Sequence, residues 1–295
     1  MSADRSTADE IGASTDGVAR ARLPTFLIVG AMRSGTTSLA RYLGEHPDVY
    51  MAPEKETHFF DRHFERGVEW YEGRFSRAAG ENAIGEATQS YMYDPDALER
   101  MHVVVPRSKL LAILRHPTDR AYSHYWLNRA RGIETLSFAD AIEAEPDRLV
   151  VSRRNRFVFS YVDRGRYVRQ LESICQRFPR ASLRVLIFEE MRAEPAIAFE
   201  AACRHIDVDP GKRPIDLGKA INAHVTFRSP RLRRLSKRLP RRARAAVGRF
   251  NVREGDYEPM QPAVRAKVNE LFRSEVVDLS DWLGRDMRPW AEALH

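Results

Sequence analysis

Cysteine is scarce in this chain, and long apolar runs are absent. Two cysteines in 295 residues, Cys175 and Cys203, cannot build a disulfide framework, and such low usage is typical of a reducing compartment. No window reaches the ~20 consecutive apolar residues that a membrane span needs. Residues 1–22 contain acids and no apolar core, which excludes a secretory signal and indicates a flexible polar tail. The sequence therefore predicts a cytoplasmic protein.

Metal-binding patterns are lacking as well, although the composition is that of an ordinary globular protein. The nine histidines and two cysteines show no spacing typical of metal ligands, so we expect no metal. With 43% hydrophobic and 30% charged residues, the chain can bury a sizeable core. We predict a flexible tail over 1–22 and one domain over 23–295.

Acidic residues are missing from one stretch, which explains the basic character of the chain. Residues 228–249 hold ten Lys or Arg and no acid, and removing ten charges from the net +7 leaves −3 for the rest. Leucines at 232, 235 and 239 would share one helical face. We therefore treat 228–253 as a basic insertion that could cover a pocket, lie on an anionic lipid surface or anchor an acidic acceptor. No nucleic-acid-binding motif accompanies the charge, so nucleic acid is not expected as a partner.

Apolar runs of strand type alternate with stretches of helical periodicity along most of the chain. Because parallel strands need crossover connections, this alternation predicts an α/β fold with a central, mostly parallel sheet flanked by helices. The predicted strands are 25–29, 49–51, 83–85, 110–114 and 183–188, and the predicted helices are 36–43, 119–131, 167–177, 196–205 and a final one over 262–283.

The first strand runs into a glycine-bounded turn and then a helix, which is a P-loop-like arrangement. Such a turn points backbone N–H groups at one spot, at the positive end of the helix dipole. Gly30 and Gly35 allow the tight turn. The side chains that could bind an anion here are those of Arg33, Ser34, Thr36, Thr37 and Ser38.

This turn differs from the loop of nucleoside triphosphatases. A Walker loop carries Lys directly after its second glycine, but Thr36 stands there. The strand over 110–114 is followed by Arg115 instead of a magnesium-binding Asp. This pattern favours an anion held by protein cations without a metal, and disfavours ATP hydrolysis. The alternative to an anion-binding loop is an ordinary turn in which the glycines serve only the backbone geometry.

Two further groups follow strand ends, where open α/β sheets place their ligands. Arg115 follows the strand over 110–114, and Ser123 lies in the next helix, so the pair could bind a second phosphate. Glu56 and His58 follow the short strand over 49–51, and two phenylalanines at 59–60 should anchor them to the core. A carboxylate such as Glu56 can serve as a general base, although a solvated ion pair with its neighbour would also explain it.

The segments 26–39 (FLIVGAMRSGTTSL), 55–60 (KETHFF) and 109–123 (KLLAILRHPTDRAYS) together resemble the three signatures of sulfotransferases that use 3′-phosphoadenylyl sulfate. The similarity is nearest to the branch of heparan sulfate 3-O- and N-sulfotransferases and their bacterial relatives. It continues more loosely through 185–190 and 283–290.

The resemblance implies a role for each matching residue. The backbone of 34–37 would hold the phosphosulfate, and Arg33 would contact the oxygen between phosphate and sulfate. Arg115 and Ser123 match the pair that binds the 3′-phosphate. Glu56 matches the catalytic base, with His58 beside it. Arg228, in the basic insertion, would add a late contact to the product adenosine 3′,5′-bisphosphate.

Two positions depart from the family pattern. Arg33 stands where most members have Lys, and because guanidinium stays protonated its role should be electrostatic. Ala87 stands where the heparan-modifying enzymes carry Lys, which leaves recognition of a polyanionic glycan open. We expect transfer to a carbohydrate, a glycolipid or a small metabolite. The alternatives are a nucleotide or small-molecule kinase with a degenerate phosphate loop, and a non-enzymatic basic membrane-associated protein.

Overall fold

A computed structural model describes residues 23–54, 56–212, 217, 225–227, 252–254, 257–288 and 290. The predicted tail over 1–22, the basic stretch 228–249 and Arg228 within it lie outside these residues. Within the described part, no helix is both long and apolar enough to cross a membrane.

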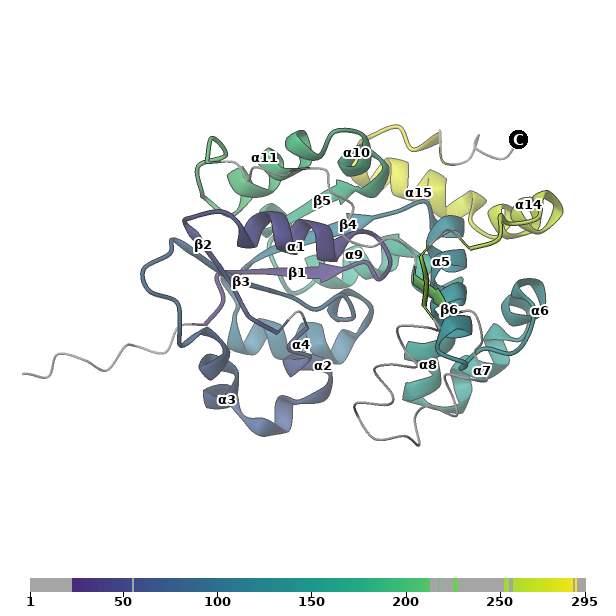
Figure 1. Ribbon diagram of the computed structural model, residues 1–295, viewed down its shortest axis with the longest axis horizontal. Helices are drawn as coiled ribbons and strands as arrows, with labels where there is room; N and C mark the ends of the chain where they lie inside the picture. Colours follow the sequence, from purple (N-terminus) through teal and green to yellow (C-terminus); the bar gives the residue numbers. More distant parts are fainter. Residues whose placement is uncertain are drawn as a thin grey trace, which may run out of the picture.

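A five-stranded parallel sheet forms the centre of the molecule (Figure 1). Its strands run in the order β2 (Val49–Met51), β3 (Ala83–Ala87), β1 (Phe26–Gly30), β4 (Lys109–Leu114) and β5 (Leu183–Ile187). Every pair of neighbours is parallel. The central strands are continuous apolar runs because both faces of the sheet are covered. The predicted fold class is confirmed, and each predicted strand lies within two residues of an observed one.

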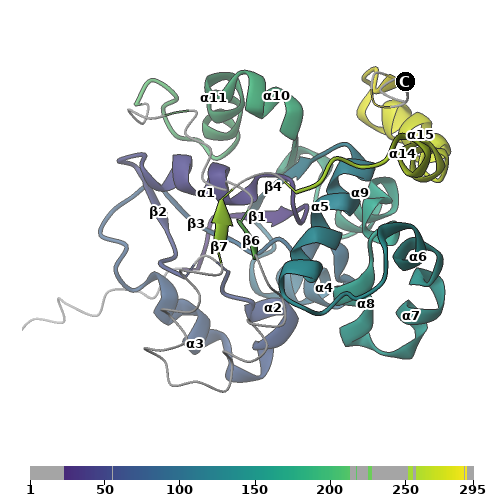
Figure 2. The ribbon, with the colours of Figure 1, turned by 45° about the vertical axis from the view of Figure 1, so that its right-hand side comes forward.

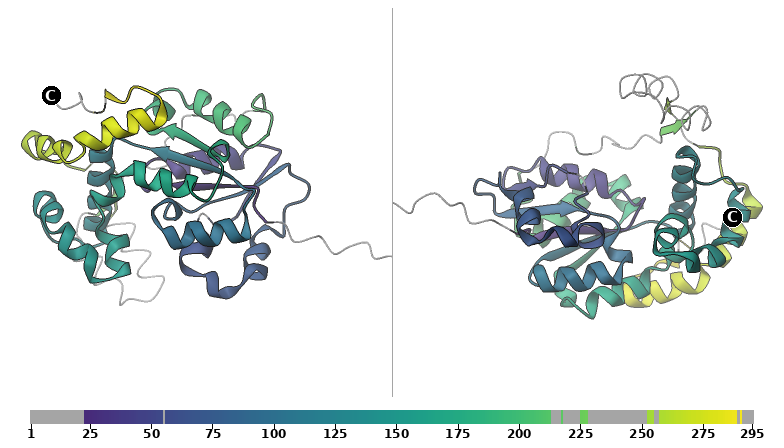
Figure 3. Two further views of the ribbon diagram at one scale, coloured as in Figure 1. Left: turned by 180° about the vertical axis from the view of Figure 1, so that it is seen from behind. Right: turned by 90° about the horizontal axis from the view of Figure 1, so that it is seen from below.

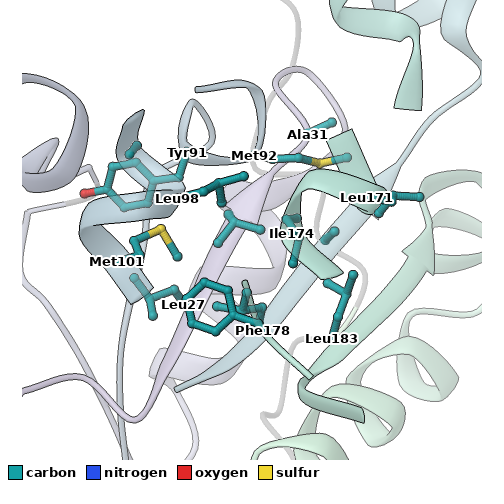
Figure 4. Close-up of a cluster of buried hydrophobic side chains, with 14 of the residues drawn as sticks. Leu27, Ala31, Tyr91, Met92, Leu98, Met101, Leu171, Ile174, Phe178 and Leu183 are labelled. Atoms are coloured by element: carbon teal, nitrogen blue, oxygen red, sulfur yellow. The ribbon is translucent and has the colours of Figure 1, made fainter. Parts of the chain in front are cut away.

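Helices cover both faces of this sheet (Figure 1). On one face lie α1 (Thr36–Gly44), α10 (Phe188–Ala193) and α11 (Pro195–His205), and on the other lie α2 (Phe59–Arg62), α3 (Val68–Glu72), α4 (Pro95–Val104) and α9 (Tyr167–Cys175). Alternate residues of β1 enter the two cores: Ile28 packs with α1 and α11, whereas Leu27 packs with α4 and α9. Figure 4 shows the side chains of α4 and α9 meeting Leu27 over the strand.

A third group of helices stands beyond the carboxyl ends of the strands (Figures 2 and 3). It comprises α5 (Pro117–Ala130), α6 (Phe138–Glu143), α7 (Glu145–Val151), α8 (Arg153–Phe159), α14 (Pro262–Glu270) and α15 (Arg273–Leu283). A separate aromatic-rich core joins α5, α6, α8 and α14, whereas α7 packs against α8, and α15 packs against α9 in the core of the sheet face. An antiparallel pair, β6 (Val225–Phe227) and β7 (Val252–Glu254), contacts α5 through β6. The structure also contains short 3₁₀ turns between these elements: η1 (Phe64–Arg66), η2 (Gly73–Phe75), η3 (Tyr91–Tyr93), η4 (Asp163–Gly165) and η5 (Arg180–Ser182).

The prediction of one final helix over 262–283 is wrong, because the chain forms two helices there. The backbone N–H of Phe272 bonds to the carbonyl of Asn269, which ends α14. Phe272 is only 1% exposed, and its ring lies so close to Gly165 that a β-carbon there would come within 2.8 Å of it. The break therefore comes from a tertiary contact, and the local sequence contains neither Gly nor Pro to signal it.

Candidate functional site

The strand order brings the predicted site segments to one edge of the sheet. Strands β3, β1 and β4 are neighbours, and β2 lies beside β3. The turn after β1, the segment 52–58 after β2, residues 88–90 after β3 and Arg115 after β4 all leave from carboxyl ends. In Figure 1 the arrow of β1 points to the side where α5 and α8 lie. A ligand bound at this edge would therefore lie between the sheet and the third group of helices.

The turn after β1 has the geometry of an anion-binding loop. Gly35 has a φ of 88° and is the N-cap of α1, and none of the described side chains caps this end. As the first residues of the helix, Thr36 and Thr37 have backbone N–H groups with no acceptor within the helix. A β-carbon on Gly35 would lie 2.9 Å from Cδ2 of Phe188, so only glycine fits here. The loop thus presents free N–H donors at the positive end of a helix.

Ser34 gives independent support for an anion at this loop. Its side chain is fully buried, and its hydroxyl has no hydrogen-bond partner among the described residues. A buried hydroxyl without a partner costs free energy, so such groups are rare outside binding sites. The hydroxyl is therefore suited to donate to a bound phosphosulfate.

Arg33 joins the loop directly to the second predicted anion site. Its Nε donates to Oγ of Ser123 across 2.9 Å, and its carbonyl accepts from Nη1 of Arg115 across 3.2 Å. Burial lowers the pKa of Arg33 below its usual value. Ser123 is 1% exposed and lies on α5. The two sites that the sequence predicted separately are one connected group.

Arg115 is held from both its backbone and its side chain. The hydroxyl of Tyr167 donates to the carbonyl of Arg115 across 2.7 Å. The guanidinium lies 4.9 Å from the ring centroid of Phe188, a cation–π distance. These contacts fix the charge at the end of β4, in hydrogen-bonding contact with Arg33.

Glu56 faces this group from the end of β2. Its Oε1 accepts from the side-chain amide of Gln89 across 2.7 Å, and its Oε2 lies 3.0 Å from Nε2 of His58. The two phenylalanines that follow, Phe59 and Phe60, are fully buried and anchor the segment as predicted. The carboxylate is therefore held on both oxygens, and Gln89 connects it to the backbone of Arg33 in the loop.

His58 lies between two carboxylates. Its Nδ1 is 3.1 Å from each carboxylate oxygen of Asp61, and Ser90 donates to Asp61 across 2.7 Å. Burial by itself lowers the pKa of His58, but the hydrogen bonds to Asp61 and Glu56 outweigh it and raise this pKa to about 9. At neutral pH His58 is an imidazolium that donates from both nitrogens.

Backbone strain marks the same two segments. Three non-glycine residues of the described chain have positive φ, and two of them are Arg33 (71°) and His58 (50°). Such conformations cost free energy and concentrate where function requires a fixed geometry. The strained residues are thus Arg33, the cation of the loop, and His58, which bonds the carboxylate of Glu56.

Sequence reasoning missed several members of the site. Asp61 could have been found, since a carboxylate three residues after His58 can reach back to it. Nothing in the sequence pointed to Gln89. Arg120, near the start of α5, was missed as well: it is fully buried, and its Nη2 donates to the carbonyls of Ser160 and Tyr161.

Arg120 belongs to a group of buried basic side chains behind the loop. Arg164 is 2% exposed, its Nη1 lies 3.5 Å from the sulfur of Met32 in the loop, and burial lowers its pKa to about 10. Burial lowers the pKa of His124 well below its usual value, and the charges of Arg120, Arg164 and Arg33 lower it further. Concentrated positive charge of this kind attracts a polyanion.

The described residues contain no group of three His, Cys, Asp or Glu side chains that could hold a metal ion. The end of β4 carries Arg115, where a triphosphatase has a metal-binding carboxylate. The donors of this site are therefore N–H groups, hydroxyls and guanidinium groups, which suit an anion.

Comparison with known proteins gives the same picture. A family profile described as the sulfotransferase domain matches residues 23–280. The membrane-associated sulfotransferase kil1 of Dictyostelium discoideum is 34% identical over 134 residues, which cover 42% of this chain and 28% of that protein. The mouse heparan sulfate glucosamine 3-O-sulfotransferase 6 is 32% identical over 185 residues, which cover 61% of this chain and 51% of that protein. The chain thus spans about a quarter and about half of the length of these two curated relatives.

A solved structure covers more of the chain. The crystal structure of a sulfotransferase from Alicyclobacillus acidocaldarius is 28% identical, with a TM-score of 0.72, and the match covers 91% of this chain and 99% of that one. The resemblance predicted from the sequence is confirmed, and it extends well beyond the three motifs.

Proposed function

This chain belongs to the sulfotransferase domain family, and we propose that it transfers a sulfuryl group from 3′-phosphoadenylyl sulfate to an acceptor hydroxyl or amine. The observation that carries the proposal is the position of Arg33. This residue of the anion loop is bonded directly to both Ser123 and Arg115, and Gln89 bonds both its backbone and Glu56. The site thus offers partners for the two separated anionic groups of the donor. It also offers Glu56 as a partner for the proton of the acceptor.

The donor would occupy the loop and the Arg115–Ser123 pair together. Backbone N–H groups of 34–37, with the hydroxyls of Ser34, Thr36, Thr37 and Ser38, would hold the 5′-phosphosulfate. Because the oxygen of Ser123 accepts from Arg33, its own hydrogen stays available for an oxygen of the 3′-phosphate. Arg115 supplies the second, charged contact.

Transfer would proceed by in-line displacement at sulfur. The acceptor oxygen or nitrogen attacks the sulfur, and its proton passes to the carboxylate of Glu56. The bond from sulfur to the bridging phosphate oxygen breaks, and adenosine 3′,5′-bisphosphate leaves with the electron pair. Arg33 stabilises the negative charge that develops on that oxygen and keeps its own proton throughout. The chain thus contributes positioning and fixed charge.

The imidazolium of His58 would keep Glu56 ready for this step. It bonds one oxygen of Glu56 from Nε2, while Asp61 holds the opposite nitrogen. A neighbouring positive charge favours the ionised form of a carboxylate, so Glu56 can accept a proton. His58 is therefore a supporting group of the base.

The acceptor would be a carbohydrate, a glycolipid or a small metabolite. Ala87, at the end of β3, is 4% exposed and carries no charge. This position therefore provides no cation that could select a polyanionic glycan. This favours acceptors that need no strong charge recognition there.

The test measures transfer of label from 3′-phosphoadenylyl [³⁵S]sulfate to a panel of saccharides, glycolipids and phenols. Glu56→Gln should lower turnover by about 10²-fold or more and keep its affinity for adenosine 3′,5′-bisphosphate. Arg115→Ala should weaken that affinity by at least about 10-fold. Glu54→Gln, which alters an exposed carboxylate paired with Arg74, is the matched control and should behave as wild type.

Each variant can contradict one part of the proposal. Full turnover in Glu56→Gln would remove the base, and unchanged bisphosphate affinity in Arg115→Ala would remove the 3′-phosphate contact. A requirement for magnesium and for ATP would instead identify a kinase. We expect turnover to continue in the presence of a chelator, because guanidinium groups and backbone N–H donors bind the anion in this proposal.

A further inference from the structure

We propose that Gln89 is a positioning residue that connects the donor loop to the carboxylate that accepts the proton. This inference rests on the proposed function and adds a residue that neither the motifs nor the charge pattern identify. Gln89 is the second residue after β3, the strand that lies between the one that leads to Glu56 and the one that leads to Arg33.

Both ends of the Gln89 amide are in use. Its Nε2 donates to Oε1 of Glu56 across 2.7 Å, and its Oε1 accepts from the backbone N–H of Arg33 across 3.4 Å. The two bonds fix which end of the amide is nitrogen, because a carboxylate only accepts and a backbone N–H only donates. Neither a carboxylate nor an apolar side chain at this position could make both bonds.

The residues on either side of Gln89 hold it in a rigid frame. Thr88 is fully buried, and its hydroxyl accepts from the backbone N–H of His58 and donates to Glu86. Ser90 is 4% exposed and donates to Asp61. Three consecutive side chains after β3 therefore each hold part of the segment that carries the base.

The donor loop packs closely against the same turn. A β-carbon on Gly30 would lie 3.5 Å from the carbonyl oxygen of Gln89 and 2.9 Å from Cβ of Met92. Through the hydrogen bond from its N–H to Oε1 of Gln89, a shift of the Arg33 backbone would move the amide, and the amide would move the carboxylate. Donor bound at the loop would thus set the direction of the oxygen that receives the proton.

Gln89 is not needed for donor binding or for folding in this scheme. The loop keeps its helix N-terminus, and Arg33 keeps its bonds to Ser123 and Arg115. Glu56 keeps its contact with His58. Loss of the amide should therefore act on the chemical step and leave bisphosphate affinity almost unchanged.

The experiment is a double-mutant cycle between Gln89 and Glu56, followed as formation of adenosine 3′,5′-bisphosphate from 3′-phosphoadenylyl sulfate. Gln89→Met keeps the length of the side chain and removes both bonds. It should lower kcat by about 10-fold in the wild-type background and by less than about 2-fold in Glu56→Gln, with donor KM and bisphosphate Kd within about 3-fold. Gln89→Glu should also lower kcat, because it places a second carboxylate beside that of Glu56. Gln176→Met, at an exposed glutamine after α9, is the control.

Two kinetic results would overturn the inference. One is an equal loss of kcat from Gln89→Met in both backgrounds, and the other is a loss confined to donor affinity. A crystal structure of Gln89→Met with adenosine 3′,5′-bisphosphate gives a readout that does not need turnover: Glu56 should change its side-chain direction, and an unchanged carboxylate would also overturn the inference. If the wild type binds no bisphosphate and cleaves no donor, it is the proposed function that fails.

Discussion

The side chain of Arg33 donates from Nε to the hydroxyl of Ser123 across 2.9 Å, and this bond joins two segments that lie 90 residues apart. It links the turn after β1 to the middle of α5. The cation of the loop is thereby fixed in direction before any donor binds. Preorganised charge of this kind costs no rearrangement when the reaction takes place.

Ser123→Ala should weaken binding of adenosine 3′,5′-bisphosphate by about 10-fold, because it removes one contact to the anion and frees Arg33. Isothermal titration calorimetry measures the change. Ser76→Ala is the matched control, since Ser76 is exposed and its hydroxyl donates only to the carbonyl of Gly73. Equal affinity in the two variants would contradict the role of Ser123.

Ser34→Ala should weaken the binding of bisphosphate without lowering the stability of the free protein. Its buried hydroxyl has no partner among the described residues, so its removal should not lower the melting temperature of the free protein. It should, however, reduce the stabilisation produced by bisphosphate, measured by differential scanning fluorimetry. Ser108→Ala provides the contrast, because Ser108 is also buried but donates to the carbonyl of Pro24 across 2.6 Å. That variant should lose about 1 kcal/mol of stability and keep its bisphosphate response.

Gly35→Ala should destabilise the fold by about 2–4 kcal/mol, from the left-handed backbone and from contact of the new β-carbon with Phe188. Gly284→Ala is the control, since Gly284 is also left-handed but has no atom within 4 Å of a β-carbon. It should cost only the backbone part, about 1–2 kcal/mol. Urea unfolding measures both, and equal costs would show that the contact with Phe188 contributes nothing.

The stability of the protein should depend on pH through His58. Its pKa in the fold is raised from 6.5 to about 9, so its contribution is complete below pH 6.5 and is lost as pH rises through 9. The difference in unfolding free energy between wild type and His58→Gln should fall by about 3 kcal/mol over that window. His63→Gln, at a half-buried histidine of the same segment, is the control. A pH-independent difference for His58→Gln would contradict the imidazolium between Glu56 and Asp61.

Several parts of the fold followed directly from local patterns. The run 26–30 is apolar throughout, and the glycines after it permit one tight turn, so strand, loop and helix were all predictable. The position of Arg115 was predictable for the same reason, because it comes immediately after a buried strand. Side chains that leave from strand ends reach one edge whenever the strands are parallel.

Other features depended on packing between distant segments. Arg120 has the sequence context of a helix start, yet the third group of helices buries it completely. The break after α14 follows from the close fit of Phe272 against Gly165. Local periodicity carries no information about which neighbour a helix will have.

Local sequence patterns were enough to identify the chemical groups that this protein brings to the carboxyl edge of its sheet: a helix N-terminus, Arg33, Arg115, Ser123 and Glu56. How these groups meet depends on the tertiary structure. The order β2-β3-β1-β4-β5 places the end of β3 between the loop and Glu56, and this gives Gln89 its two partners. Strand order is set by how all the crossover helices pack together, so no single segment of the sequence could reveal that contact.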